Sequence, residues 1–289
     1  MRGRLVDIGG RRLHVVQAGP PRARPLVVLE HGAYGCAADW AVVQERLAAH
    51  GLRSLAYDRA GMGLSDAGPP PRDGRAANRD LAALMDVLGE TAPVLLAGHS
   101  MGGLWGRLFV LDHPDRVLGL VLADAVAPEV MGLPGGAAAV RGFGRLLQVV
   151  SAGARFGLMV PAAQVTHRFI GLTGEAKQEK RRIQASARHA RGSAEEVAEW
   201  PATSALVGAR PLPPELPVAV VTAGALRGGN PVKRLQEAPA RASRAGYVEH
   251  VAGSTHSSLL GPRYADAILK AVEHVLQAAN LGALPGHQA

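Results

Sequence analysis

The chain has 289 residues, 47% hydrophobic and 19% charged, with one cysteine, Cys36; this composition predicts a folded protein with a large core and excludes an internal disulfide. No stretch reaches the roughly 18 continuous apolar residues of a membrane span, and no apolar leader segment follows the charged start, so we expect a cytoplasmic protein without a membrane span. The net charge of +8 comes almost entirely from arginines scattered through every segment, and only 4% of residues are aromatic, which argues against a nucleic-acid partner.

The first half of the chain predicts alternating strands and helices. Two strand-like runs, 4–8 and 12–17, flank Gly9-Gly10 and predict an antiparallel hairpin. Continuous apolar runs predict strands buried on both faces, at 25–30, 52–57, 93–97 and 117–123. Helical spacing predicts helices at 38–49, with Asp39 as the N-cap, at 76–88, and from 104 onward. This order predicts an α/β fold with right-handed crossovers and a parallel sheet.

The second half interrupts this alternation with a helical insertion. Residues 128–214 lack a buried-strand pattern but predict helices at 140–158, 175–191 and 194–205. We expect this insertion to lie over the strand ends as a lid. The alternation resumes with strands at 217–223 and 247–251 and helices at 232–245 and 264–277. The predicted division is a core of 1–127 and 215–278, an all-helical cap of 128–214 and a loose tail of 279–289.

The segment Gly98-His99-Ser100-Met101-Gly102 fits the pattern G-x-S-x-G, between a predicted strand and a predicted helix. In that context the pattern indicates a nucleophile elbow, whose tight turn exposes the serine hydroxyl. A serine hydroxyl is a poor nucleophile until a base takes its proton. The Met101 N–H, at the start of the helix, has no intrahelical partner and is suited to hold an oxyanion.

Four motifs in order carry a resemblance to a known family: His31-Gly32, the segment 58–66 (Asp-Arg-Ala-Gly-Met-Gly-Leu-Ser-Asp), the elbow at Ser100, and His256 in a loop rich in Gly, Ser and Thr before the last helix. With these motifs the chain resembles the α/β-hydrolase superfamily, in the branch with a helical cap after the sixth strand. The resemblance implies a mostly parallel sheet flanked by helices, Ser100 as nucleophile and His256 as its base. It also implies that the backbone N–H groups of Ala33 and Met101 form the oxyanion hole.

The acid that orients His256 departs from the common pattern. Many relatives carry it after the seventh strand, but residues 222–230 contain no carboxylate. Asp124, at the end of the sixth strand, occupies the alternative position used in some relatives and preserves the chain order Ser, acid, His. Three alternatives stay open: Asp124 caps the following turn, Glu129 is the acid, or the site is a Ser-His dyad.

Other residues near the motifs are expected to be structural. We expect His31 to brace the oxyanion loop, His99 to pack against the sheet and Tyr34 to line the pocket. Within 58–66, Asp58 and Arg59 match a loop that braces the floor of the site in the family.

These residues together favour a serine hydrolase that cleaves an ester or another activated acyl group through an acyl-enzyme. The partner is then a small-molecule acyl substrate, and no metal or organic cofactor is implied, because neither metal-ligand spacing nor a phosphate loop occurs. Two alternatives stay open: other chemistry at the same site (C–C or amide hydrolysis, a lyase or a perhydrolase reaction), or a ligand-binding homologue without turnover. Family expectation argues against epoxide hydrolase and haloalkane dehalogenase, which carry Asp at the position of Ser100. Substrate identity and oligomeric state stay open.

Overall fold

The computed structural model describes residues 2–226 and 230–282, and within them it contains an eight-stranded, mostly parallel sheet. The strand order is β1-β2-β4-β3-β5-β6-β7-β8. The hairpin predicted around Gly9-Gly10 forms β1 and β2, which are antiparallel to their neighbours, whereas β3 to β8 are parallel. The predicted α/β fold class is confirmed. The strands are β1 Arg4–Asp7, β2 Arg12–Ala18, β3 Leu26–Glu30, β4 Arg53–Tyr57, β5 Val94–His99, β6 Val117–Ala123, β7 Val218–Ala223 and β8 Gly246–Val251.

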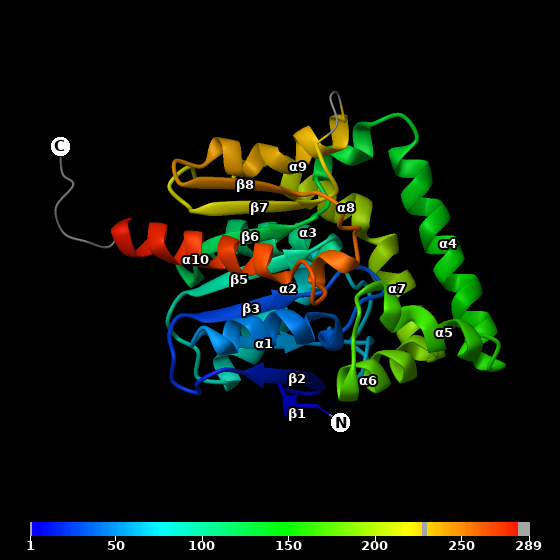
Figure 1. Cartoon of the computed structure of the whole chain (residues 1–289). Helices are drawn as coiled ribbons and strands as arrows, with labels where there is room; N and C mark the ends of the chain where they lie inside the picture. The colour runs from blue at the N-terminus through cyan, green and yellow to red at the C-terminus, as the bar shows by residue number, and fades with distance from the viewer. Residues whose placement is uncertain (1, 227–229, 283–289) are drawn as a thin grey trace.

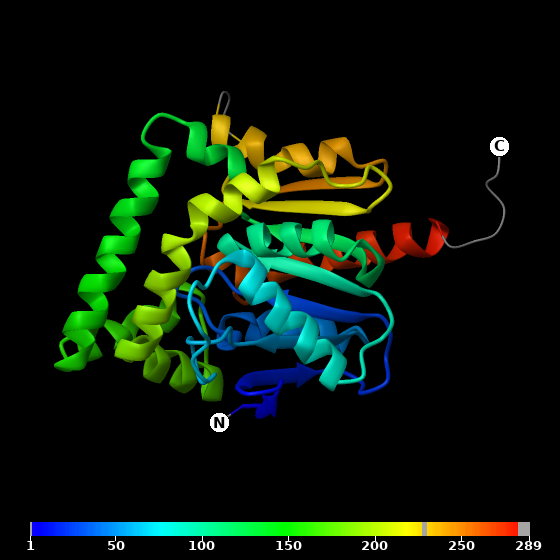
Figure 2. The same ribbon diagram turned by 180° about the vertical axis from the view of Figure 1, so that it is seen from behind.

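Helices cover both faces of the sheet, as expected where strands are buried on both sides. The helices α1 (Ala41–Ala49) and α10 (Ala265–Gly282) lie on one face and share one apolar core with it. The helices α2 (Gly74–Val87), α3 (Met101–Asp112) and α9 (Pro231–Ala242) lie on the other face. Figures 1 and 2 show these two layers from opposite sides.

Between β6 and β7 the structure has five helices, α4 to α8, which gather at the carboxyl ends of the parallel strands (Figure 1). They are α4 Gly136–Arg155, α5 Val160–Thr166, α6 Gly174–Gln184, α7 Ala187–Ala198 and α8 Trp200–Gly208. Ligand sites of parallel sheets lie at these carboxyl ends. The division into a core and a cap at 128–214 stays a prediction.

Several predicted helix bounds were wrong. The stretches 175–191 and 194–205 form three helices, because Ser186 accepts the His189 N–H and starts a new helix, and Pro201 occupies the first turn of the next. The short α5 was missed. Asp39 is not an α-helix N-cap, since it lies inside a 3₁₀ turn, Ala37–Trp40, that precedes α1.

At the C-terminus, α10 begins at Ala265 and ends at Gly282. It therefore reaches into the stretch 279–289 that was predicted as a loose tail. Residues 283–289 lie outside the described residues. Over the described part of the chain, no single helix is long and apolar enough to cross a membrane, although the bent pair Gly136–Arg155 and Val160–Phe169 meets that criterion by length and composition together.

Candidate active site

Ser100 lies in a strained turn between β5 and α3. Its backbone angles are φ 56° and ψ −126°, a conformation that a non-glycine residue rarely adopts. The turn requires small neighbours: a Cβ added to Gly98 would lie 2.6 Å from the Gly102 oxygen, and one added to Gly102 would overlap the Glu30 oxygen. The predicted elbow therefore has its expected backbone geometry, with the Ser100 side chain at its tip.

Asp124 and His256 meet at the same edge of the sheet. Asp124 follows β6 in a left-handed conformation (φ 42°), and His256 lies in the loop after β8. The His256 Nδ1 is 2.6 Å from Asp124 Oδ2. The other carboxylate oxygen accepts hydrogen bonds from the Ala223 N–H at 3.1 Å and the Gln236 Nε2 at 3.3 Å.

These contacts keep the Asp124 carboxylate ionised. Burial raises the pKa of Asp124, but the hydrogen bond and charge of His256, together with the Ala223 N–H, outweigh burial and hold this pKa below its ordinary value. The carboxylate therefore favours a proton on His256 Nδ1, which leaves Nε2 free to act as a base.

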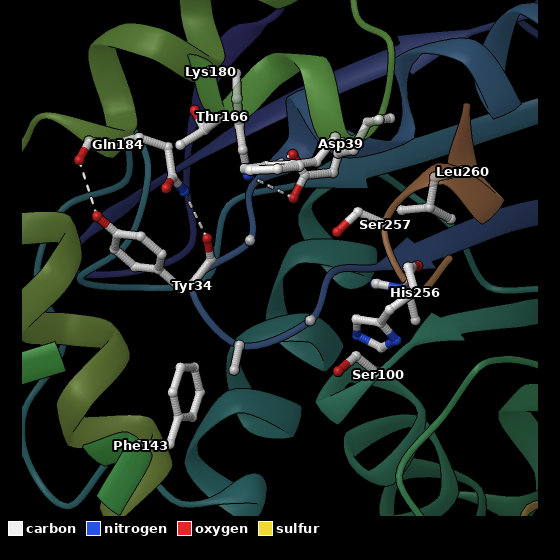
Figure 3. A pocket seen from close by; sticks show the side chains of 16 residues that line it. Tyr34, Asp39, Ser100, Phe143, Thr166, Lys180, Gln184, His256, Ser257 and Leu260 are labelled. Carbon is white, nitrogen blue, oxygen red and sulfur yellow. Dashed lines mark hydrogen bonds and ion pairs between the residues drawn. The ribbon is translucent and has the colours of Figure 1, made fainter. Parts of the chain in front are cut away.

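Ser100 and His256 line one cavity of about 330 Å³. Figure 3 shows the Ser100 side chain beside the His256 imidazole at one side of this cavity. The structure thus brings together the three residues predicted as nucleophile, base and acid. Glu129, the second acid candidate, lines a different cavity, next to Arg107.

The loop after β3 passes over the nucleophile. A Cβ added to Gly32 would lie 2.9 Å from the Ser100 Cβ, and Ala33 lines the cavity. Among the hydrogen bonds of residues 2–226 and 230–282, neither the Ala33 N–H nor the Met101 N–H has a protein acceptor. The next donor along the loop, the Tyr34 N–H, is bound by Ser193 Oγ at 2.7 Å. The two N–H groups predicted as oxyanion donors are therefore free to bind a ligand.

His99, a buried residue of β5, contacts His256 directly, and this contact was not predicted. Its ring lies 4.4 Å from the His256 ring, and its Nε2 donates to the His256 backbone oxygen at 2.9 Å. Burial, followed by the nearby His256, lowers the pKa of His99 to about 3, so the ring is neutral near neutral pH. His99 thus holds the backbone of the loop that carries His256. The position of His99 next to Ser100 in the sequence was the one signal that could have predicted its contact with the loop of His256.

A buried arginine braces the loop after β3, which is the predicted oxyanion loop. The Arg59 guanidinium donates to the His31 oxygen at 2.7 Å and the Gly32 oxygen at 3.3 Å, and it pairs with Glu30 and Glu196. Burial alone would lower the pKa of Arg59, but the two carboxylates raise it above its ordinary value. His31 Nδ1 lies 2.8 Å from the Gly32 oxygen, as a bracing role predicts. The link from Arg59 to Glu196 of α7 was missed, because nothing in the local sequence pairs these distant residues.

The far wall of the cavity consists of polar contacts between α6 and the loop after β3. Lys180 Nζ lies 2.7 Å from Asp39 Oδ1 and 2.9 Å from Oδ2. Gln184 Nε2 donates to the backbone oxygen of Tyr34 at 2.8 Å, and the Tyr34 hydroxyl donates to the backbone oxygen of Gln184 at 2.9 Å (Figure 3). Tyr34 lines the pocket as predicted. Because Asp39 neutralises Lys180, this wall offers hydrogen-bonding groups without an unpaired charge.

A second cavity, of about 340 Å³, lies on the Asp124 side of His256. His256 and Phe143 line both cavities. The walls of the second cavity are mostly apolar and include Ala125, Val140 and Trp200. His256 therefore lies between a polar and an apolar cavity.

Comparisons with known proteins agree with this architecture. The profile of the alpha/beta hydrolase fold family matches residues 25–205. Epoxide hydrolase A of Mycobacterium tuberculosis is 38% identical over 138 residues, which cover 45% of this chain and 39% of that protein. The matches span less than half the length of the curated relatives.

Two solved structures are similar along most of the chain. A thermophilic esterase from Thermogutta terrifontis has a TM-score of 0.67 at 22% identity and covers 92% of this chain and 94% of its own. An enol-lactonase from Burkholderia xenovorans LB400 has a TM-score of 0.67 at 23% identity and covers 95% of this chain and 100% of its own. At these identities the two structures support the fold alone. The family profile covers more than half of the chain, which therefore belongs to the alpha/beta hydrolase fold family.

Proposed function

We propose that this hydrolase-family protein is a serine carboxylesterase that acts through a Ser100-His256-Asp124 triad and an acyl-enzyme. The observation that carries the proposal is the 2.6 Å contact between His256 Nδ1 and Asp124 Oδ2, beside a serine held at positive φ in the elbow. Serine at position 100 favours acyl transfer to a hydroxyl over the carboxylate chemistry expected of an aspartate at that position.

The proposed reaction uses each group once in each half. Ser100 Oγ attacks the ester carbonyl carbon while His256 Nε2 takes its proton, and Asp124 stabilises the imidazolium. The carbonyl oxygen becomes an oxyanion that accepts from the Ala33 and Met101 N–H groups, and each such donor contributes about 3 kcal/mol in the transition state. His256 then gives the proton to the leaving alcohol as the ester C–O bond breaks, which leaves the acyl group on Ser100. Water next attacks the acyl carbon while His256 takes its proton, and His256 returns that proton to Ser100 Oγ as the acid product leaves.

The two cavities support an uncharged ester as the substrate class. The polar cavity supplies hydrogen-bonding groups, but its lysine is neutralised by Asp39, so a carboxylate on the substrate would gain little there. The apolar cavity beside Val140 and Trp200 fits an alkyl or aryl group. We propose that residues 128–214 act as the cap, since Phe143 and Lys180 of this segment line the cavities.

The test combines covalent labelling with turnover. A fluorophosphonate probe should label the wild type, and p-nitrophenyl acetate and octanoate should both be hydrolysed. Ser100→Ala should abolish labelling and lower kcat by at least about 10⁴-fold. Ser257→Ala serves as the control, because Ser257 lines the same cavity but has no part in the proposed triad. A wild type inert to probe and esters, or labelling that survives Ser100→Ala, would contradict the proposal.

A further inference from the structure

Seven large apolar side chains are exposed on one short part of the cap. Their exposed fractions run from 40% to 80%, and they belong to α4, α5 and the segments that flank α5. We call this group the apolar cap face: Leu146, Val149, Phe156, Leu158, Val160, Val165 and Phe169. Folded proteins rarely expose so many large apolar groups together unless the surface binds something.

The arrangement on α4 shows why these side chains are not core. The buried residues Val140, Leu147 and Ser151 face inward, where α4 packs along α7. Leu146, Val149 and Phe156 follow at spacings of three and seven residues, so they share a different side of the helix. Figure 1 shows α4 as the outermost helix of the group, and Figure 2 shows the same from behind.

The charged side chains of the segment that carries this face have one sign. Arg141, Arg145, Arg155 and Arg168 are exposed, and residues 130–174 contain no aspartate or glutamate. On α4, Arg145 lies four residues after Arg141 and four residues before Val149, so these arginines and the apolar side chain follow the same side of the helix. A helix with large apolar side chains beside arginines is typical of one that lies in the plane of a lipid interface.

We propose that the apolar cap face docks on an anionic lipid surface. The apolar side chains would enter the boundary between head groups and acyl chains, and the arginines would contact the anionic head groups. A second copy of this chain fits less well, because a symmetric contact through this face would bring arginines against arginines. Charge complementarity therefore favours the lipid surface over self-association.

Docking would place the substrate cavity next to the lipid. Phe169 belongs to the apolar cap face and also lines the cavity that contains Ser100. An ester dissolved in the lipid could therefore pass along Phe169 to the nucleophile, and this consequence rests on the proposed esterase function. The docking itself does not require catalysis.

Co-sedimentation of the full chain with vesicles tests the docking. We expect binding to vesicles of phosphatidylcholine with phosphatidylglycerol and much weaker binding to phosphatidylcholine alone. Leu146→Ser with Val149→Ser and Phe156→Ser should remove binding, whereas Val87→Ser, an exposed apolar residue on α2, should not. Replacing arginines 141, 145 and 155 by Gln should weaken binding about a hundredfold, since each basic residue near an anionic surface contributes about fivefold. The matched control replaces the exposed arginines 4, 22 and 24 by Gln and should leave binding nearly unchanged.

The outcomes separate the docking from the esterase proposal. Ser100→Ala should bind vesicles as the wild type does, so binding can succeed or fail independently of fluorophosphonate labelling. Light scattering of the protein without vesicles tests whether a second copy of this chain covers the apolar cap face instead. A dimer that dissociates in the triple serine variant, or equal binding to both kinds of vesicle, would overturn the docking proposal.

Discussion

Replacing Asp124 by Asn tests the proposed triad most sharply, because the hydrogen bonds around this residue determine how the asparagine amide would orient. In the wild type, Oδ1 accepts from the Ala223 N–H and Gln236 Nε2, and Oδ2 faces His256 Nδ1. An asparagine keeps the first set only if its oxygen takes the Oδ1 place, which turns its NH₂ group toward His256. Nδ1 must then accept, the proton moves to Nε2, and Nε2 can no longer take the proton of Ser100.

The expected loss in kcat is about 10⁴-fold, or about 5.5 kcal/mol in the barrier, as for a serine hydrolase locked in the wrong histidine tautomer. Initial rates of p-nitrophenyl acetate hydrolysis measure it, and urea unfolding checks that the variant is folded. Glu129→Gln is the matched control, since Glu129 lies beside Arg107 in another cavity, and it should keep nearly full activity. Asp124→Asn activity within about tenfold of the wild type would refute the assignment of Asp124 as the acid.

Three further comparisons probe the packing around the site. Arg59→Met should lower the free energy of unfolding by about 3–5 kcal/mol, because it leaves two buried carboxylates, Glu30 and Glu196, without their cationic partner. Arg12→Met on the surface should change this free energy little, and urea titration of both variants distinguishes the two environments. Gly106→Ala should raise the melting temperature, because Gly106 lies inside α3 and its new Cβ would meet nothing closer than 3.5 Å. Gly98→Ala should lower the free energy of unfolding by about 1–3 kcal/mol and reduce activity, because its Cβ would meet backbone atoms at 2.6 Å. Calorimetry that finds Gly98→Ala more stable than Gly106→Ala would contradict the elbow geometry. His189 is buried and its pKa is lowered to about 3, first by burial and then by Lys180, so only the unfolded chain binds a proton there as the pH falls below about 6.5. Going from about pH 7 to about pH 5 should therefore cost the wild type about 2 kcal/mol more in unfolding free energy than His189→Gln, measured by urea unfolding at both pH values.

The sequence predicted best where one segment carries a complete signal. The apolar runs at 25–30 and 117–123 gave β3 and β6 to within a residue of their ends, because a strand buried on both faces is uniformly apolar. The elbow was predicted from its two flanking glycines, since the turn leaves no room for a Cβ at Gly98 or Gly102. Asp124 was predicted as the acid because residues 222–230 contain no carboxylate; the structure places Asp124 against His256, and its catalytic role stays a proposal.

The features that were not predicted from the sequence depend on contacts between distant segments. The pairing of Arg59 with Glu196 joins residues 137 positions apart, and no local pattern indicates such a pair. The contact of His99 with His256 also spans the chain. The apolar cap face was not predicted because an exposed and a buried apolar residue are the same letter in a sequence. In the sequence, arginines 141, 145 and 155 look like part of the scattered arginines, and only the structure shows that α4 carries them on the same outer surface as Val149 and Phe156.

The arrangement at the end of β7 supports the proposal that an acid after β6 serves this site. Lys233 Nζ donates to the Thr222 hydroxyl at 3.1 Å and to the Ala223 oxygen at 2.7 Å, so an ammonium group occupies the end of the strand after which many relatives carry their acid. The same strand end turns the Ala223 N–H toward the carboxylate of Asp124. Burial lowers the pKa of Lys233, while the charge of Asp124 opposes this shift. The end of β7 thus supplies a hydrogen-bond donor and a nearby positive charge in place of an acid, and both stabilise the ionised form of a carboxylate that arrives from the neighbouring strand.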